Sequence, residues 1–132
     1  MSVTEPNVTV SDIGTFSTWY NDKDQLHRED GPAWIQHNND GHIYEVWYKN
    51  DMYHRIGAPA SIIRRNGLVL GETWYLYGEE MEEEQYKKVM RTCKRAIAKL
   101  KSRLRKTYVE ILKDTDICDE INLYNIIADY VI

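Results

Sequence analysis

The sequence predicts an α+β fold, in which an N-terminal antiparallel sheet of β-hairpin repeats is followed by a C-terminal pair of α-helices. A set of aromatic, basic and Pro-Ala landmarks recurs at an interval of about 27 residues within residues 1–78. From residue 79 onward, apolar residues recur at steps of three and four, which is helical spacing. The 132 residues fit a single modest core. We therefore expect the hairpin region and the helical region to form one compact unit.

Three residue pairs define the repeat in one register. Trp-Tyr occurs at 19–20, 47–48 and 74–75, His-Arg at 27–28 and 54–55, and Pro-Ala at 32–33 and 59–60. A single hairpin is marginally stable in water, whereas stacked hairpins bury a shared face. The repeat therefore predicts a short array of hairpins over residues 1–78.

Turn signals place one hairpin in each repeat. The runs Asn39-Asp40-Gly41 and Asn66-Gly67 favour tight turns, because Asn, Asp and Gly tolerate positive φ. Strand composition flanks each turn, at 33–37 and 43–49 and again at 60–65 and 68–77. Asn50-Asp51 predicts a further turn between the Trp-Tyr strand and the His-Arg loop.

Residues 79–132 form the predicted helical region, with a long basic helix over about 79–113 and a short helix over about 117–131. The long helix has a heptad-like apolar seam, which also includes Cys93. The seam can serve an antiparallel fold-back or a homodimer, and the sequence leaves both open. The candidate seam contacts are Tyr86, Met90, Ile97, Leu100, Leu104 and Ile111.

Charge is segregated along the chain. Residues 85–113 hold 11 basic side chains and one acidic side chain, although the whole chain has a net charge of −4. Such a helix can meet nucleic-acid phosphates, or it can be neutralised by the acidic segments that flank it or by an acidic partner. The candidate contacts are Lys87, Lys88, Arg91, Lys94, Arg95, Lys99 and Arg103.

The sequence offers no arrangement typical of an enzyme. It has no metal-ligand spacing, no glycine-rich phosphate motif, and no nucleophile with a nearby base. His27 and His54 occupy equivalent repeat positions, so we expect each to make a structural hydrogen bond, with the adjacent Arg28 and Arg55 in salt bridges. The sequence therefore predicts a non-enzymatic protein with no cofactor and no metal.

The chain also lacks signals for export or membrane insertion. No apolar run approaches the roughly 20 residues that span a bilayer, and the N-terminus has no signal-peptide pattern. The two cysteines, Cys93 and Cys118, are expected to be free thiols. These features predict a cytoplasmic protein that does not bind membranes.

The phrase H-R-E-D-G-P-A at residues 27–33, followed by a hairpin turn and W-Y-K-N at 47–50, resembles a known repeat. It is similar to the MORN-like (membrane occupation and recognition nexus) variant found in proteins of tailed phages and large DNA viruses. The resemblance covers residues 18–78, and the third copy has Glu82-Glu83 in place of His-Arg. It implies a short β array for protein interaction, in a phage or viral protein that acts in host cytoplasm.

The leading functional hypothesis is therefore a protein-protein interaction module that binds and modulates a host protein, such as a defence factor. Trp and Tyr dominate binding hot spots. The candidate partner-binding residues on the sheet are Trp19, Trp34, Trp47, Tyr48, Trp74 and Tyr75. Two alternatives remain open: nucleic-acid binding through the basic helix at 85–113, and a structural or assembly role. A homo-oligomer through the helical region is a further alternative to a host partner.

Overall fold

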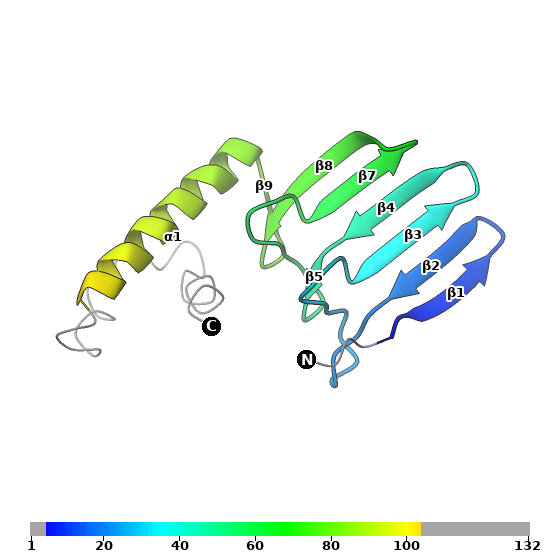
Figure 1. Ribbon diagram of the computed structural model, residues 1–132, viewed down its shortest axis with the longest axis horizontal. Coiled ribbons are helices and arrows are strands. Elements are labelled where there is room, and N and C mark those ends of the chain that lie inside the picture. The colour runs from blue at the N-terminus through cyan, green and yellow to red at the C-terminus, as the bar shows by residue number, and fades with distance from the viewer. Residues whose placement is uncertain (1–4, 104–132) are drawn as a thin grey trace. The chain divides into compact units, whose positions relative to one another are not determined.

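The computed structural model describes residues 5–103 and confirms the α+β fold class, with an antiparallel sheet of hairpins followed by a helix (Figure 1). The elements of this part of the chain are β1 (Asn7–Ser11), β2 (Gly14–Thr18), β3 (Trp34–Asn38), β4 (His42–Val46), β5 (Tyr48–Lys49), β6 (Met52–Tyr53), β7 (Ser61–Arg65), β8 (Leu68–Leu76), β9 (Glu79–Met81) and α1 (Glu83–Arg103).

Seven strands form one antiparallel sheet in the order β1-β2-β3-β4-β7-β8-β9, while β5 and β6 pair separately. The hairpins predicted around residues 39–41 and 66–67 are confirmed as β3–β4 and β7–β8. The predicted turn at Asn50-Asp51 joins β5 to β6, and both residues have positive φ, at 50° and 65°. This left-handed pair matches the right-handed twist of hairpin strands.

The first hairpin, β1–β2, keeps the spacing of the repeat, because β1, β3 and β7 begin at Asn7, Trp34 and Ser61. It has a regular register from Asn7↔Thr18 to Ser11↔Gly14. Gly14 cannot be replaced without a backbone shift, because a Cβ there would collide with the carbonyl oxygen of His37 on β3. This close approach seats the first hairpin against the first repeat.

A short hairpin follows each of the three long hairpins along the chain. Each later short hairpin contacts the short hairpin before it. The first closes at a Tyr20↔Leu26 bridge, the second is β5–β6, and the third is the end of β8 with β9. The turn of each later hairpin bonds to the one before it: Asp51 N donates to Leu26 O (3.0 Å), and Gly78 N donates to Tyr53 O (2.9 Å). The two contacts are 27 residues apart, so the repeat is also a repeat of hydrogen bonds.

The two repeat histidines complete this docking. Asn50 N donates to His27 Nδ1 (3.3 Å), and Tyr77 N donates to His54 Nδ1 (3.1 Å). The expected structural hydrogen bond of each histidine is therefore confirmed. Each imidazole accepts a hydrogen bond from a backbone N–H of a turn, and that N–H has no partner in the strand pairing.

The long helix begins later than predicted, at Glu83 instead of about residue 79. Tyr77 and Gly78 have positive φ, at 47° and 85°, and turn the chain so that Glu79–Met81 pairs with β8. Strand pairing there overrides the helix preference of the glutamate run. The chain divides into two compact units, residues 1–86 and 87–132. The second predicted helix, at 117–131, lies outside the described residues.

Within residues 5–103, no helix combines the length and apolar character needed to cross a membrane.

Candidate functional site: two faces of the hairpin sheet

One face of the sheet carries a row of alternating large and small side chains. The backbone bonds Trp19 N to Ala33 O (2.9 Å) and Trp47 N to Ala60 O (2.8 Å) continue the strand register beyond β2 and β4. Residues that are opposite in an antiparallel ladder share a face. The register therefore places five side chains side by side across the strands, here called the tryptophan row: Trp19, Ala33, Trp47, Ala60 and Trp74.

The alanines of this row explain the repeated Pro-Ala pair. Both Ala33 and Ala60 are 0% exposed. Each lies between two indole rings of the row, so a larger side chain would overpack the site. The Pro-Ala landmark is thus a packing requirement of the fold.

Each tryptophan of the row is covered by another side chain. The Arg28 guanidinium lies 4.0 Å from the ring centroid of Trp19, and that of Arg55 lies 3.7 Å from the ring of Trp47. Such cation–π contacts contribute about 0.5–1 kcal/mol at exposed sites and more when desolvated. Burial lowers the pKa of Arg55, which shows that its guanidinium is partly desolvated. The His-Arg landmark therefore supplies a hydrogen bond and a lid over the indole.

Only one of the two expected arginine salt bridges is found among the described residues. Arg28 Nε lies 2.8 Å from Asp30 Oδ1. This bridge holds the pKa of Asp30 below its ordinary value. In the second repeat, Gly57 stands 27 residues after Asp30 and offers no carboxylate.

The third tryptophan is covered by Tyr86, because the third copy has no His-Arg pair. The ring centroids of Trp74 and Tyr86 are 4.7 Å apart. The Tyr86 hydroxyl donates to Arg55 O (2.8 Å) and accepts from Gly57 N (2.6 Å). The glycine that replaces Asp30 in the second repeat therefore provides the N–H that anchors Tyr86. Two departures from the repeat pattern combine to close the row.

The opposite face of the sheet carries a different set of apolar residues. Trp34 is opposite Thr18 and Val46, so it points away from the tryptophan row. The register places on this same side four half-buried side chains from β2, β3, β4 and β7, here called the aromatic face: Phe16, Trp34, Tyr44 and Ile63. The rings of Phe16 and Trp34 are 6.1 Å apart between centroids.

A third aromatic group lies on the short hairpins. Tyr53 is 4.6 Å from Tyr48 and 4.8 Å from Tyr75 between ring centroids. The Tyr75 hydroxyl donates to Glu80 Oε2 (2.9 Å). Burial raises the pKa of both Tyr48 and Tyr75, and hydrogen bonds to Tyr53 and Glu80 respectively raise it further. This tyrosine stack of Tyr48, Tyr53 and Tyr75 ties the second short hairpin to the third.

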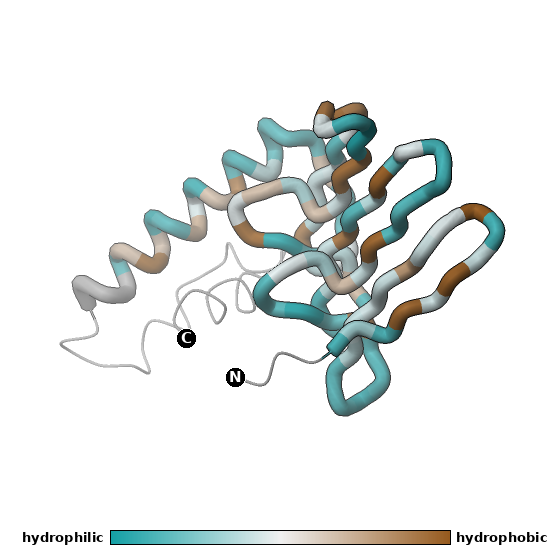
Figure 2. Tube along the Cα trace, turned by 45° about the vertical axis from the view of Figure 1, so that its right-hand side comes forward, coloured by the Kyte–Doolittle hydropathy of each residue, from teal (hydrophilic) through white to brown (hydrophobic). Residues whose placement is uncertain are grey.

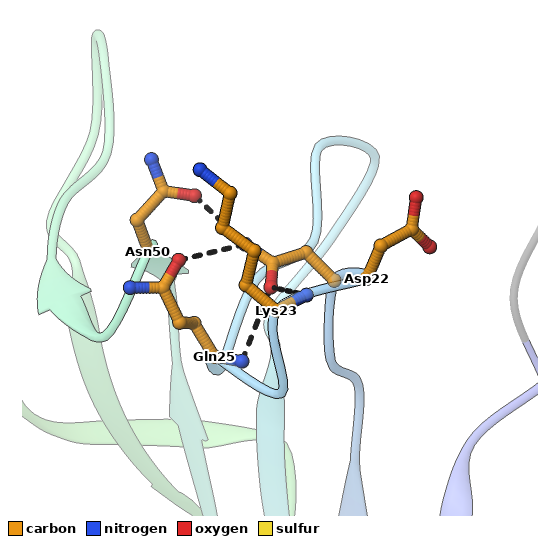
Figure 3. A pocket seen from close by; sticks show the side chains of 5 residues that line it. Asp22, Lys23, Gln25 and Asn50 are labelled. Carbon is orange, nitrogen blue, oxygen red and sulfur yellow. Dashed lines mark hydrogen bonds between the residues drawn. The ribbon is translucent and has the colours of Figure 1, made fainter.

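A polar hollow of about 250 Å³ lies between the 20–26 loop and the β5–β6 turn (Figure 3). The Asn21 side chain makes all its hydrogen bonds within these loops. Its Oδ1 accepts from the backbone N–H groups of Lys23 and Gln25, and its Nδ2 donates to the side-chain oxygens of Gln25 and Asn50. The hollow therefore joins two short hairpins, and the Asn21 amide makes its full set of four hydrogen bonds there.

The helix separates its apolar and basic residues. The seam residues Tyr86, Met90, Cys93 and Ile97 are buried. The predicted phosphate contacts from Lys87 to Lys99 are all exposed. Leu100 and Arg103 fall in the last turn of α1, and Leu104 and Ile111 lie outside the described residues.

The structure thus distributes the six predicted sheet contacts over three places. Trp19, Trp47 and Trp74 share the covered row, Trp34 lies on the aromatic face, and Tyr48 and Tyr75 belong to the tyrosine stack. The predicted set does not form one surface. Sequence reasoning missed the neighbours of Trp34, which are Phe16, Tyr44 and Ile63. The sequence indicates these neighbours only through the alternation of side chains along each strand, and that alternation places them on one face only when the strand register is known.

No group of three or more potential metal-ligating side chains converges within residues 5–103. Comparison with known proteins finds no protein-family model, no curated protein and no solved structure that matches this chain.

Proposed function

We propose that this protein is a non-enzymatic binding module that presents the aromatic face of its sheet to a protein partner. The observation that supports this proposal is an apolar cluster at positions of the aromatic face that differ between the repeats. Trp34, Gln36 and Tyr44 are replaced 27 residues later by Ser61, Ile63 and Gly71. The tryptophan row, in contrast, repeats its Trp and Ala residues.

This difference separates residues that the fold requires from residues that it does not. A packing rule common to all hairpins demands the same residue in each copy. A half-exposed Trp or Tyr present in one copy only has no such role. Large aromatic side chains at exposed positions are the usual centres of binding hot spots. The aromatic face is accordingly the surface that we assign to a partner.

The MORN-like resemblance of residues 18–78 supports a setting for this module. It suggests a phage or viral protein that binds and modulates a host protein in the cytoplasm, and a defence factor is one such target. The repeat landmarks that carry the resemblance are now seen to be packing residues. They therefore bear on the scaffold, and the partner is selected by other positions.

Affinity purification with the full chain as bait tests the proposal. A partner recovered in stoichiometric amount is purified, and its affinity is measured by calorimetry for the wild type and for Trp34→Ala. Hot-spot truncation costs at least about 2 kcal/mol, so the dissociation constant is expected to rise about 30-fold.

The control is Val69→Ala near the β7–β8 tip, where the side chain is 46% exposed and lies opposite Arg64, on the other face of the sheet from Ile63. It should leave the affinity unchanged. A partner that binds Trp34→Ala and wild type equally well, with the variant still folded by circular dichroism, would refute the assignment.

The second candidate function is nucleic-acid binding through α1. The observation that favours it is the exposure of Lys88, Arg91, Lys94 and Arg95 beside a buried seam. Phosphate contacts release counterions, so affinity should fall steeply as salt rises.

Fluorescence anisotropy with mixed DNA and RNA at low salt tests this candidate. A variant with Glu at Lys94, Arg95 and Lys99 is expected to lose binding, while Trp34→Ala should retain it. Absence of any anisotropy change for the wild type at low salt excludes the candidate.

A further inference from the structure

The outer strand of the sheet, β1, is unusually open to pairing. All five residues of Asn7–Ser11 are exposed, and within residues 5–103 β1 has a strand neighbour on one side only. The side chains of Val8 and Val10 are 58% and 77% exposed. Figure 1 shows β1 at the edge of the sheet, and Figure 2 shows hydrophobic segments along the outermost hairpin.

This edge has none of the usual devices that prevent association. Proteins protect edge strands with charged side chains, proline, bulges or very short strands. Within β1 there is no charged residue and no proline, and its register with β2 is unbroken.

The opposite edge of the same sheet is protected in part: within the described residues β9 pairs with Trp74–Leu76, and residues 68–73 of β8 pair with β7 alone. β9 is three residues long and exposes Glu79 and Glu80. The preceding strand pair, β7–β8, has a register shift at Ile63/Arg64. The open part of β8 carries the exposed charge of Glu72 and lies beside this register shift, and β1 has neither of these two protective features.

We propose that β1 pairs antiparallel with β1 of a second copy of this chain, which joins the two sheets into one. The sequence of the strand itself favours a second copy as the partner of this edge. Asn-Val-Thr-Val-Ser has nearly the same order when reversed, and a two-fold axis pairs each residue with its reverse. Thr9 then faces its own copy, and Val8 faces Val10 of the second copy.

The pairs formed in this way are favourable ones. A Thr–Thr pair contributes about 0.2–1 kcal/mol across strands, and like charges would oppose pairing. No charge is present in β1 to cause such repulsion. The four valines come together on one side of the joined sheet, and the exposed backbone groups of the two edges satisfy one another.

The geometry also fixes what happens to the aromatic faces. A two-fold axis that relates antiparallel neighbours is perpendicular to the sheet, so like faces of the two copies lie on the same side. Phe16, on the strand next to β1, brings the aromatic face near the axis. Dimerisation therefore extends the aromatic face across two copies. One five-residue strand pair falls short of the roughly 1,200 Å² of a standard interface, so we expect a weak, concentration-dependent dimer.

Sedimentation equilibrium of the full chain over a wide concentration range tests the proposal. The wild type is expected to shift from monomer to dimer as concentration rises. The double variant Val8→Lys/Val10→Lys should stay monomeric at every concentration, because each new charge faces another across the axis. The matched control Leu68→Lys/Leu70→Lys places the same charges on side chains that are 70% and 56% exposed, and it should dimerise as the wild type does.

Amide hydrogen exchange locates the contact. Alternate amides of residues 7–11 are expected to exchange more slowly as the wild-type concentration rises, and not to do so in Val8→Lys/Val10→Lys. A wild type that remains monomeric throughout overturns the proposal. A dimer that survives Val8→Lys/Val10→Lys also overturns it, and would point to the helix seam instead.

Discussion

The two faces of the sheet contain similar residues and use them differently. On one face, Trp19, Trp47 and Trp74 alternate with two fully buried alanines and are covered by Arg28, Arg55 and Tyr86. On the other face, Trp34 is half-buried, as Trp47 and Trp74 are, and its ring centroid lies 6.1 Å from that of Phe16. The first set recurs every 27 or 28 residues, and the second does not recur at that interval. In this chain, repetition marks what the fold needs, and we propose that departure from it marks the surface that binds a partner.

The largest expected effect comes from opening the covered row at its most buried tryptophan. Trp19 is 8% exposed and is stacked by Arg28. Trp19→Ala should lower the free energy of unfolding by about 3–5 kcal/mol, because it removes a large buried side chain and leaves a cavity. Urea denaturation followed by circular dichroism measures the loss. A change below about 1 kcal/mol would contradict the role assigned to the row.

Overpacking the same row should cost somewhat less. Ala60→Leu inserts a large side chain between Trp47 and Trp74, and is expected to destabilise the protein by about 1–3 kcal/mol. The control is Ser61→Leu at the neighbouring position, which points to the opposite face and should change stability by less than about 1 kcal/mol. Equal losses for the two variants in thermal denaturation would show that the alanine position is not restricted.

Removal of the Tyr86 hydroxyl tests whether Tyr86 closes the tryptophan row. Tyr86→Phe removes the hydroxyl that bonds Arg55 O and Gly57 N. Leaving those groups without their partner should cost about 1–3 kcal/mol. Tyr20→Phe, at a tyrosine that is 38% exposed, is the control and should stay within about 0.5 kcal/mol. If both variants unfold at the same urea concentration, Tyr86 does not anchor the third tryptophan.

The smallest expected effect is a loss of stability in strong base. Burial raises the pKa of Tyr48 and Tyr75 above the ordinary value of 10.0. Above pH 10 the unfolded chain releases these protons while the folded chain retains them, so stability falls as pH rises. Tyr48→Phe/Tyr75→Phe should flatten this decline in denaturation curves recorded between pH 9 and pH 11. An unchanged slope would mean that the tyrosine stack does not contribute to it.

The repeat made much of the fold predictable from sequence. The β3–β4 and β7–β8 hairpins, the Asn50-Asp51 turn and the histidine bonds all follow from positions that recur in register. The first hairpin keeps the 27-residue spacing, but it was missed because its one landmark is Trp19-Tyr20 and no His-Arg or Pro-Ala pair precedes it. The start of the helix was misplaced because strand pairing at Glu79–Met81 competes with local helix preference.

The candidate site was less predictable, for a physical reason. Adjacent residues of a strand point to opposite faces, so a list of tryptophans cannot say which of them share a surface. That assignment needs the pairing of Trp34 with Thr18 and Val46. The lid formed by Tyr86 was likewise invisible, because a seam position on a helix gives no sign that its hydroxyl meets a glycine 29 residues earlier.

Removing the same side chain from each face tests the division between them most directly. The free energies of unfolding of Trp47→Ala and Trp34→Ala are compared by urea denaturation under identical conditions. Trp47 lies in the row under Arg55, so we expect a loss of about 3 kcal/mol or more for Trp47→Ala, and about half of that or less for Trp34→Ala. Equal losses, or a larger loss for Trp34→Ala, would contradict the assignment of one face to folding and the other to binding.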